Sequence, residues 1–292
     1  MHELADSLED FVFEDEIREG NHHAVFRLSR EGQVFILKAT KCGDQEAYNL
    51  EREIRCYESS ILNQVQPDLD DYGTAKGYVY HVTEHCGDTP RGPWTAAQAH
   101  RYAETLAEVL GNIHGEKSVQ WADVEGWKRS VTSLSEECQD EVLDTDKKKY
   151  VSSVTSWLQA VETNTRVSHG DVKLGNTIVG RGGSLTNMVD WEHVKLRSKY
   201  FDLAKAELRI LRSHFKHGEG IDGCIDRFRR AYPEQLDERI LTILELLKAF
   251  RIRGRLERMG PYKDWVKRRS ESISDVYDDI IAHLKRVTPI IE

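Results

Sequence analysis

The sequence lacks the features that mark several large protein classes. Its five cysteines are scattered and form no Cys-x-x-Cys pair, which argues against a disulfide framework or a zinc site and favours a reducing compartment. No apolar run approaches membrane-spanning length, and the acidic first residues lack the apolar core of a signal peptide. We therefore expect a cytoplasmic protein that has no membrane partner.

An excess of positive charge is also missing. The formal net charge is −9 at pH 7 over 292 residues, so binding to nucleic acid is not expected. Hydrophobic residues make up 39% of the chain, which is typical of a folded globular protein and argues against disorder. The length allows one large domain or two lobes with a sizeable core.

The hydrophobic pattern begins with strands. Residues 11–40 contain three strand-like runs separated by turns, which predicts an antiparallel meander. Residues 45–62 change to helical spacing, and strand character returns at 77–83. The segment 86–93 is rich in Gly and Pro, so we place a lobe boundary there.

Beyond these breakers the pattern is mostly helical. Thr95 and Gln98 form a capping-box signature at a helix start, and residues 136–162 predict one or two further helices. Residues 166–192 interrupt the helices with short strands around a Gly-Gly turn. Strands followed by helices predict an α+β fold rather than a doubly wound sheet. The two predicted lobes are residues 1–86 and 87–292.

The chemically most informative segment has the sequence His-Gly-Asp-Val-Lys-Leu-Gly-Asn and ends at Asn176. Asp171 and Asn176 have the spacing of a kinase catalytic loop, in which the Asp accepts a hydroxyl proton and the Asn binds metal. Asp190 follows an apolar strand, where an unpaired carboxylate would be costly, and could also reach Mg²⁺. Each residue alone could simply occupy a turn or a strand end. The ordered set favours phosphoryl transfer from a metal nucleotide.

Two lysines could bind phosphate. Lys173 could reach the transferring phosphoryl group as a point charge, or it could be a solvated loop residue. Lys38 ends an apolar strand, and Glu53 borders the buried stripe of the following helix, so they could form the ion pair that holds nucleotide phosphates. A snorkelling lysine and a solvated glutamate are the alternatives. Glu192 could contact the metal, support it from further out, or form a structural salt bridge.

Two histidine-containing features have simpler interpretations. We expect His169 to be a hydrogen-bonded scaffold residue rather than an acid or a base. The turn at residues 20–23 could cover phosphates with its backbone amides, but it is poor in glycine, and an ordinary hairpin turn explains it equally well.

With these residues the sequence resembles the aminoglycoside phosphotransferase and choline kinase-like group, whose fold is similar to that of protein kinases. His-Gly-Asp at 169–171, Asp-Trp-Glu at 190–192 and Phe-Asp-Leu-Ala at 201–204 carry the resemblance, which covers most of the chain. It implies a bilobal protein kinase-like fold with a small antiparallel β lobe that has one helix, and a larger, mainly helical lobe. It also implies ATP and Mg²⁺, and transfer of the γ-phosphoryl group to a hydroxyl of a small molecule.

The resemblance further implies roles for individual residues. Asp202 would brace the catalytic loop, and the segment 84–86 resembles the hinge whose backbone reads adenine. Lys173 departs from the group, which often has His at this position, and matches protein kinases instead. The implied catalytic residues are Asp171 and Lys173, the metal ligands are Asn176 and Asp190, and the nucleotide-binding residues are Lys38, Glu53, Val25, Ile36, Glu84 and Cys86.

Two other functions remain as alternatives. Lys173 is compatible with a protein Ser/Thr kinase, but no Ala-Pro-Glu and no long activation loop follow the Asp-Trp-Glu segment. A nucleotide-binding pseudokinase module is the second alternative. The complete set of residues argues against it, because a module without catalysis need not retain all of them.

Basic residues cluster near the C-terminus and bear on the acceptor. Nine lie between Lys248 and Arg269 and only two acidic residues oppose them, so the segment carries a charge of +7. It could be a solvated helix face, or it could bind an anionic acceptor such as a phosphorylated or carboxylated metabolite. The second hypothesis predicts that charge reversal at Arg251, Arg253 and Arg255 raises the KM for the acceptor but not for ATP. An unchanged acceptor KM would remove it.

Overall fold

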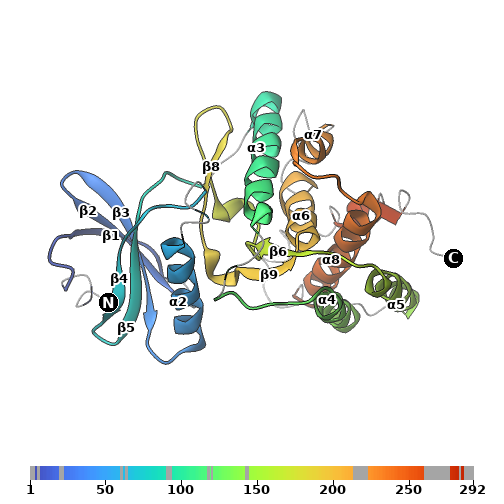
Figure 1. The fold of residues 1–292 in the computed structure, drawn as a ribbon, viewed down its shortest axis with the longest axis horizontal. Helices are drawn as coiled ribbons and strands as arrows, with labels where there is room; N and C mark the ends of the chain where they lie inside the picture. The colour runs from blue at the N-terminus through green and yellow to red at the C-terminus, as the bar shows by residue number, and fades with distance from the viewer. Residues whose placement is uncertain are drawn as a thin grey trace.

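Two lobes make up the molecule in the computed structural model, one built on a sheet and one mainly helical (Figure 1). The structure describes residues 4, 7–19, 23–59, 62, 65–89, 94–116, 119, 121–141, 145–212, 223–259, 277–282, 284 and 285. The predicted α+β arrangement, with strands first and helices after, is confirmed. The boundary proposed at residue 86 falls in the segment that leads from the sheet to the helical lobe.

The small lobe is a five-stranded antiparallel sheet in the order β1-β2-β3-β5-β4. Its strands are β1 (Val12–Glu19), β2 (Ala24–Arg30), β3 (Gln33–Lys41), β4 (Leu69–Ala75) and β5 (Tyr78–Glu84), and helix α2 (Gln45–Glu58) packs against β3, β5 and β4. The pattern did not predict β4. That strand, Leu-Asp-Asp-Tyr-Gly-Thr-Ala, holds few apolar residues because it lies at the edge of the sheet, where no position needs full burial.

The two faces of the sheet have different tasks. Successive side chains of a strand point to opposite faces, and on β3 the residues Phe35, Leu37 and Ala39 belong to an apolar cluster on one face. Ile36 and Lys38 point to the other face, which α2 covers. The sheet therefore buries its own core on one side and presents a lysine toward the large lobe on the other.

The large lobe is mainly helical, and residues 277–282, 284 and 285 near the end of the chain are also helical. Six of its α-helices have bounds that the structure describes in full. They are α3 (Ala96–Gly115), α4 (Trp127–Glu141), α5 (Thr145–Ala160), α6 (Tyr200–Ala206), α7 (Cys224–Ala231) and α8 (Glu238–Met259). The predicted capping box is present at the start of α3, where the Thr95 hydroxyl accepts from the backbone N–H of Gln98 and the Gln98 side chain accepts from the N–H of Thr95. No described helix combines the length and apolar character that crossing a bilayer requires.

Short strands carry the motifs to the junction of the lobes. β6 (Thr165–Ser168) pairs with β9 (Lys195–Ser198), and β7 (Thr177–Val179) pairs with β8 (Leu185–Met188) around the predicted Gly-Gly turn. The residues from His169 to Asn176, which we call the motif loop, connect β6 to β7. The 3-10 turn η3 (Trp191–His193) follows β8, and β9 begins two residues later. The η3 turn packs against α2, and the motif loop contacts η3 through the rings of His169 and Trp191.

Candidate functional site

A buried ion pair joins the sheet to α2. The Lys38 Nζ donates a hydrogen bond of 2.7 Å to the Oε2 of Glu53, whose side chain is almost completely buried. The Oε1 of Glu53 accepts from the Tyr57 hydroxyl and from the backbone N–H of Trp191, both at 3.1 Å. Glu53 therefore binds the sheet lysine and the Asp-Trp-Glu segment at the same time, and the predicted pairing of Lys38 with Glu53 is observed.

Lys38 also contacts Asp190 of the large lobe. Its Nζ lies 2.8 Å from the Asp190 Oδ1 and 3.6 Å from the Glu192 Oε2. Burial alone would lower the pKa of Lys38, but Glu53, Asp190 and Glu192 outweigh burial and raise the pKa above its ordinary value. Asp190 has a left-handed backbone with φ 69°, which costs a non-glycine residue roughly 1–3 kcal/mol when the surroundings impose it. The fold holds Asp190 in this conformation next to the lysine.

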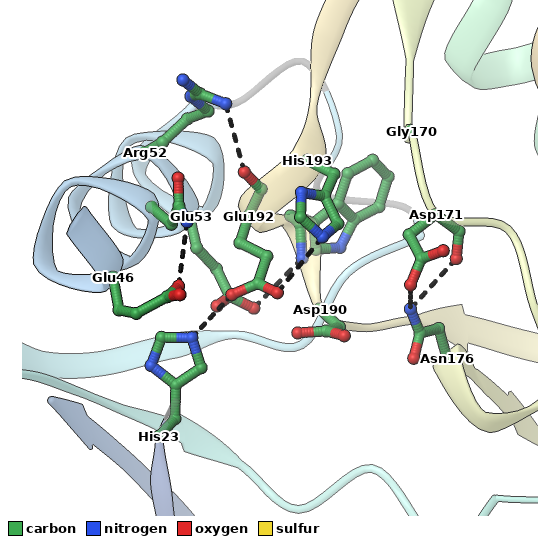
Figure 2. Close-up of polar contacts among 12 residues, drawn as sticks. His23, Glu46, Arg52, Glu53, Gly170, Asp171, Asn176, Asp190, Glu192 and His193 are labelled. Carbon is green, nitrogen blue, oxygen red and sulfur yellow. Dashed lines mark hydrogen bonds and ion pairs between the residues drawn. The ribbon is translucent and has the colours of Figure 1, made fainter. Parts of the chain in front are cut away.

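Glu192 is contacted by His23, which lies directly before β2; residues 20–22 of the predicted phosphate-covering turn lie outside the described residues. The His23 Nε2 lies 2.7 Å from the Glu192 Oε2, and the Arg52 side chain donates to the Glu192 backbone carbonyl at 3.3 Å (Figure 2). Burial would raise the pKa of Glu192, but the hydrogen bond from His23 and the charge of Lys38 lower it to about 2. Of the roles left open by the sequence, these contacts favour an ion-pair role for Glu192.

Asp202 fixes the backbone of the motif loop. Its buried carboxylate accepts hydrogen bonds from the backbone N–H groups of His169 (2.7 Å) and Gly170 (3.1 Å), and from the Arg197 guanidinium (3.1 Å). Burial would raise the pKa of Asp202, but His114 and Arg197 hold it well below its ordinary range. The prediction that Asp202 braces this loop is confirmed.

His169 is a neutral scaffold residue, as expected. The Asp171 backbone N–H donates to its Nδ1 at 3.2 Å, and its Nε2 lies 3.1 Å from the carbonyl of Val189. A ring that accepts at Nδ1 and donates from Nε2 is the neutral tautomer. Burial accordingly lowers the pKa of His169. The ring also packs on Trp191 with 4.5 Å between the centroids, which ties the two motifs together.

The Asp171 carboxylate lies among cations. Its Oδ2 is 2.5 Å from the Lys173 Nζ, and its Oδ1 is 2.7 Å from the Lys205 Nζ and 3.8 Å from the Arg209 Nη1. Burial would raise the pKa of Asp171, but Lys205 and Lys173 outweigh burial and keep the pKa below its ordinary value. Asp171 is therefore an ionised hydrogen-bond acceptor at neutral pH.

Asn176 and Asp190 could hold a divalent cation. The Asn176 Nδ2 donates to the Asp171 backbone carbonyl (3.0 Å) and to its Oδ2 (3.3 Å), which directs the amide oxygen away from that carboxylate. Figure 2 shows Asp190 between Glu192 on one side and the Asp171–Asn176 pair on the other. An amide oxygen and a carboxylate are the hard donors that Mg²⁺ prefers, and one or two protein ligands suffice when phosphates supply others. The donor set fits Mg²⁺.

The segment after β5 could read a nucleotide base through its backbone. Glu84 ends the strand, and the His85 backbone N–H donates to the Val34 carbonyl at 3.1 Å. The Cys86 thiol approaches the Glu84 carbonyl at 3.6 Å. The segment is thereby held against the sheet at the point where the chain passes to the large lobe.

Apolar side chains from both lobes flank this segment. Val25 pairs directly with Lys38, and Ile36 lies two residues before it, so both share the lysine's face of the sheet. From the large lobe, Ile178 approaches so closely that a Cβ on Gly87 would lie 3.2 Å from its Cγ2. This arrangement could enclose a planar base between the lobes, and sequence reasoning had not identified Ile178.

The comparisons with known proteins agree with this geometry. The model of the phosphotransferase enzyme family matches residues 15–240. The chain belongs to this family. No curated protein sequence matched the chain.

Solved structures share the fold over nearly the whole chain. A thermostable mutant of aminoglycoside phosphotransferase APH(4)-Ia is 15% identical, with a TM-score of 0.64 and coverage of 96% of this chain and 97% of that chain. Spectinomycin phosphotransferase APH(9)-Ia, in complex with ADP and spectinomycin, is 15% identical, with a TM-score of 0.60 and 98% coverage of both chains. Aminoglycoside-3'-phosphotransferase of type VIII is 19% identical, with a TM-score of 0.59, and covers 85% of this chain and 97% of that chain. Such identities establish the kinase-like fold alone.

In this member of the phosphotransferase family, three residues that form contacts at the site had not been predicted from the sequence. His23 contacts Glu192, which is 169 residues away in the sequence, so no local pattern could have revealed this contact. Lys205 and Arg209 did leave a signal. They are four residues apart and follow Asp202, so they share one helix face beside the residue that braces the motif loop.

The described side chains of the basic segment, up to Leu256, make little contact with this cluster. The Arg251 side chain pairs with Glu137, and the Arg253 Nε lies 2.9 Å from the Asp278 Oδ1. The Lys248 Nζ lies 5.1 Å from the centroid of the Phe201 ring on α6. Lys263, Lys267, Arg268 and Arg269 lie outside the described residues, as does the side chain of Arg258. The contacts of Arg251 and Arg253 favour the solvated-face interpretation.

Gly170 provides a test of the motif loop. Its φ is +86°, and a Cβ there would lie 2.0 Å from the His193 backbone carbonyl. We expect Gly170→Ala to lower the free energy of unfolding by about 2 kcal/mol or more. Gly175→Ala in the same loop is the matched control, because a Cβ there meets nothing within 4 Å. Equal thermal stability of the two variants would contradict this loop geometry.

Cys86 tests the proposed hinge. Burial and the nearby Glu84 raise the pKa of its thiol to about 11. Since the thiolate is the nucleophile, alkylation of Cys86 by iodoacetamide should be slow at pH 8 and rise about tenfold per pH unit toward pH 11. An adenine nucleotide should protect Cys86 and leave the exposed Cys42 unprotected. Peptide mass spectrometry would measure both rates, and labelling of Cys86 that is insensitive to nucleotide would contradict the hinge assignment.

Proposed function

We propose that the protein transfers the γ-phosphoryl group of ATP, with Mg²⁺, to a hydroxyl of a small molecule. One observation carries the proposal. Lys38, Asp171, Asn176 and Asp190 come from distant segments, yet Lys38 bonds Asp190 directly, and the Lys173 Nζ lies 2.5 Å from Asp171 and 3.5 Å from Asp190. The family match and the ADP and AMP-PNP complexes of structurally similar aminoglycoside phosphotransferases support it.

In this proposal the small lobe binds the nucleotide. The backbone of residues 84–86 contacts adenine, and Val25, Ile36 and Ile178 enclose the base. Lys38 binds phosphate oxygens, and Glu53 keeps its ammonium in place. Asn176 and Asp190 hold the Mg²⁺, which neutralises phosphate charge when bound.

Asp171 acts mainly by position. Its pKa is below the ordinary value, so it is a weak base, but a loose phosphoryl-transfer transition state requires little proton removal early in the reaction. Asp171 would accept the hydrogen bond of the acceptor hydroxyl and direct its lone pair toward phosphorus. Lys173, between Asp171 and Asp190, would stabilise the charge on the transferring group.

The structure gives little room for a protein kinase. β9 begins at Lys195 and α6 at Tyr200, so regular structure follows the Asp-Trp-Glu segment at once. The chain between the Asp-Trp-Glu segment and α6 is too short to contain a long activation segment that would bind a peptide. This favours a small-molecule acceptor.

Paired variants test the proposal. We expect Asp171→Ala to lower kcat by roughly 10²–10⁴-fold, with little change in nucleotide affinity, because the substrate hydroxyl loses the carboxylate that accepts its hydrogen bond.

Asp190→Ala should abolish turnover even where some nucleotide still binds. A phosphotransfer screen of the wild type with sugars, amino alcohols, antibiotics and nucleosides, with Asp171→Ala for comparison, would identify an acceptor, and turnover of both variants would be measured with it against a reaction without enzyme. Wild-type turnover in Asp190→Ala would contradict the metal assignment, and tight ATP binding without transfer to any acceptor would favour the pseudokinase alternative.

A further inference from the structure

The two oxygens of the Asp171 carboxylate face different surroundings. The Oδ2 contacts Lys173 and Asn176, the residues that lead to Asp190 and the proposed nucleotide. The Oδ1 contacts Lys205 and Arg209, which come from α6 and from the π-helical segment η4 (Glu207–Arg212) of the large lobe. Lys205 and Arg209 therefore contact the oxygen of Asp171 that Lys173 and Asn176 do not contact. In the proposed function this is the side from which the acceptor approaches.

Positive charge on this side exceeds negative charge. Among the described residues, Asp171 is the only carboxylate that forms an ion pair with Lys205 or Arg209. Lys248 lies nearby without any hydrogen bond from its ammonium to a described residue; its contact is the face of the Phe201 ring. Burial lowers the pKa of Lys248, and the charges of Arg197 and Lys205 lower it further. Cations gathered in a partly buried place are costly unless an anion compensates them.

The helical segment that carries Lys205 and Arg209 has two unusual features. Like charges four residues apart on one helix face repel each other, so Lys205 and Arg209 weaken the helix that carries them. Arg209 also lies in a π-helical segment, a rare conformation that occurs frequently at functional sites. Its side chain is 34% exposed and that of Lys205 is 16% exposed, so Arg209 is the more accessible of the two to a ligand.

We infer that the acceptor is an anionic hydroxy compound whose carboxylate or phosphate is bound by Arg209, with Lys205, while Asp171 orients its hydroxyl. This inference rests on the proposed function and names its substrate class. The Arg209 Nη1 lies 3.8 Å from Asp171, so the hydroxyl and the anionic oxygen are no more than about 9 Å apart when each makes a hydrogen bond. A compact hydroxy acid or sugar phosphate meets this limit. A polycationic antibiotic would be repelled by Lys205 and Arg209.

Matched acceptors test the charge requirement. The wild-type enzyme would be assayed for transfer from ATP to gluconate, glucose 6-phosphate, glucose, homoserine, homoserine amide and kanamycin. We expect a higher kcat/KM for the member of each pair that carries a carboxylate or phosphate group, and these two groups identify which anion is used. Preferred transfer to glucose, homoserine amide or kanamycin, which carry neither group, would overturn the inference while leaving the proposed function intact.

Arginine variants test the residue assignment. Loss of a charge-assisted hydrogen bond should raise the KM for the anionic acceptor about 10–100-fold in Arg209→Gln, with the KM for ATP changed less than twofold. Arg209→Lys should recover part of the loss. Arg253→Gln is the matched control, because Arg253 pairs with Asp278 on another part of the lobe. A higher KM for ATP alone in Arg209→Gln would assign Arg209 to the nucleotide and overturn the inference.

A binding measurement keeps the inference testable without turnover. Calorimetry with saturating AMP-PNP and Mg²⁺, which fill the nucleotide site, would measure the Kd of inorganic phosphate and of gluconate. At least one anion should bind to the wild type and to Arg253→Gln, and about tenfold or more weakly to Arg209→Gln. Equal Kd values in all three proteins, or no binding of either anion, would overturn the anionic site, whereas failure of AMP-PNP to bind would overturn the proposed function.

Discussion

The rest of the site depends on the buried contact of the Lys38 ammonium with Glu53 and Asp190. One carboxylate comes from α2 of the small lobe and the other from the large lobe, so this single ammonium joins the two. A buried charge is tolerated only with partners, and removal of one partner leaves the others uncompensated. Glu53 extends the link, because it also accepts from Tyr57 and from the Trp191 backbone. The contacts of Lys38 thus hold the two lobes together and also set the charge of the proposed phosphate site.

The large lobe supplies a second rigid element through Asp202. By accepting two backbone N–H groups of the motif loop, it fixes the loop without contacting the reacting groups. Gly170 allows the loop to pass against His193, and the neutral His169 ring links it to Trp191. One oxygen of Asp171 contacts Lys173 and Asn176, and the other contacts Lys205 and Arg209. On the inference drawn above, a few side chains at one helix would adapt a fold shared with aminoglycoside phosphotransferases to an anionic acceptor.

Much of the fold and of the candidate site could be predicted because the informative residues lie close together in the sequence. The spacing of Asp171 and Asn176 within one loop, and the capping box at Thr95 and Gln98, depend on local geometry that a pattern can show. Strand β4 was missed because an edge strand needs few apolar residues. The composition of the basic segment near Arg251 suggested a binding site for an anionic acceptor. In the structure, Arg251 and Arg253 instead pair with carboxylates that lie far from them in the sequence.

The sequence by itself determined the α+β order of elements, the motif loop and the family resemblance, since each follows from spacing over a few residues or from a run of apolar positions. Only the tertiary structure decided that His23 contacts Glu192, that Ile178 faces Gly87, and that Lys205 and Arg209 share Asp171 with Lys173. These contacts join segments separated by tens to more than a hundred residues. Their existence depends on how the lobes and helices pack, which no local pattern of residues specifies.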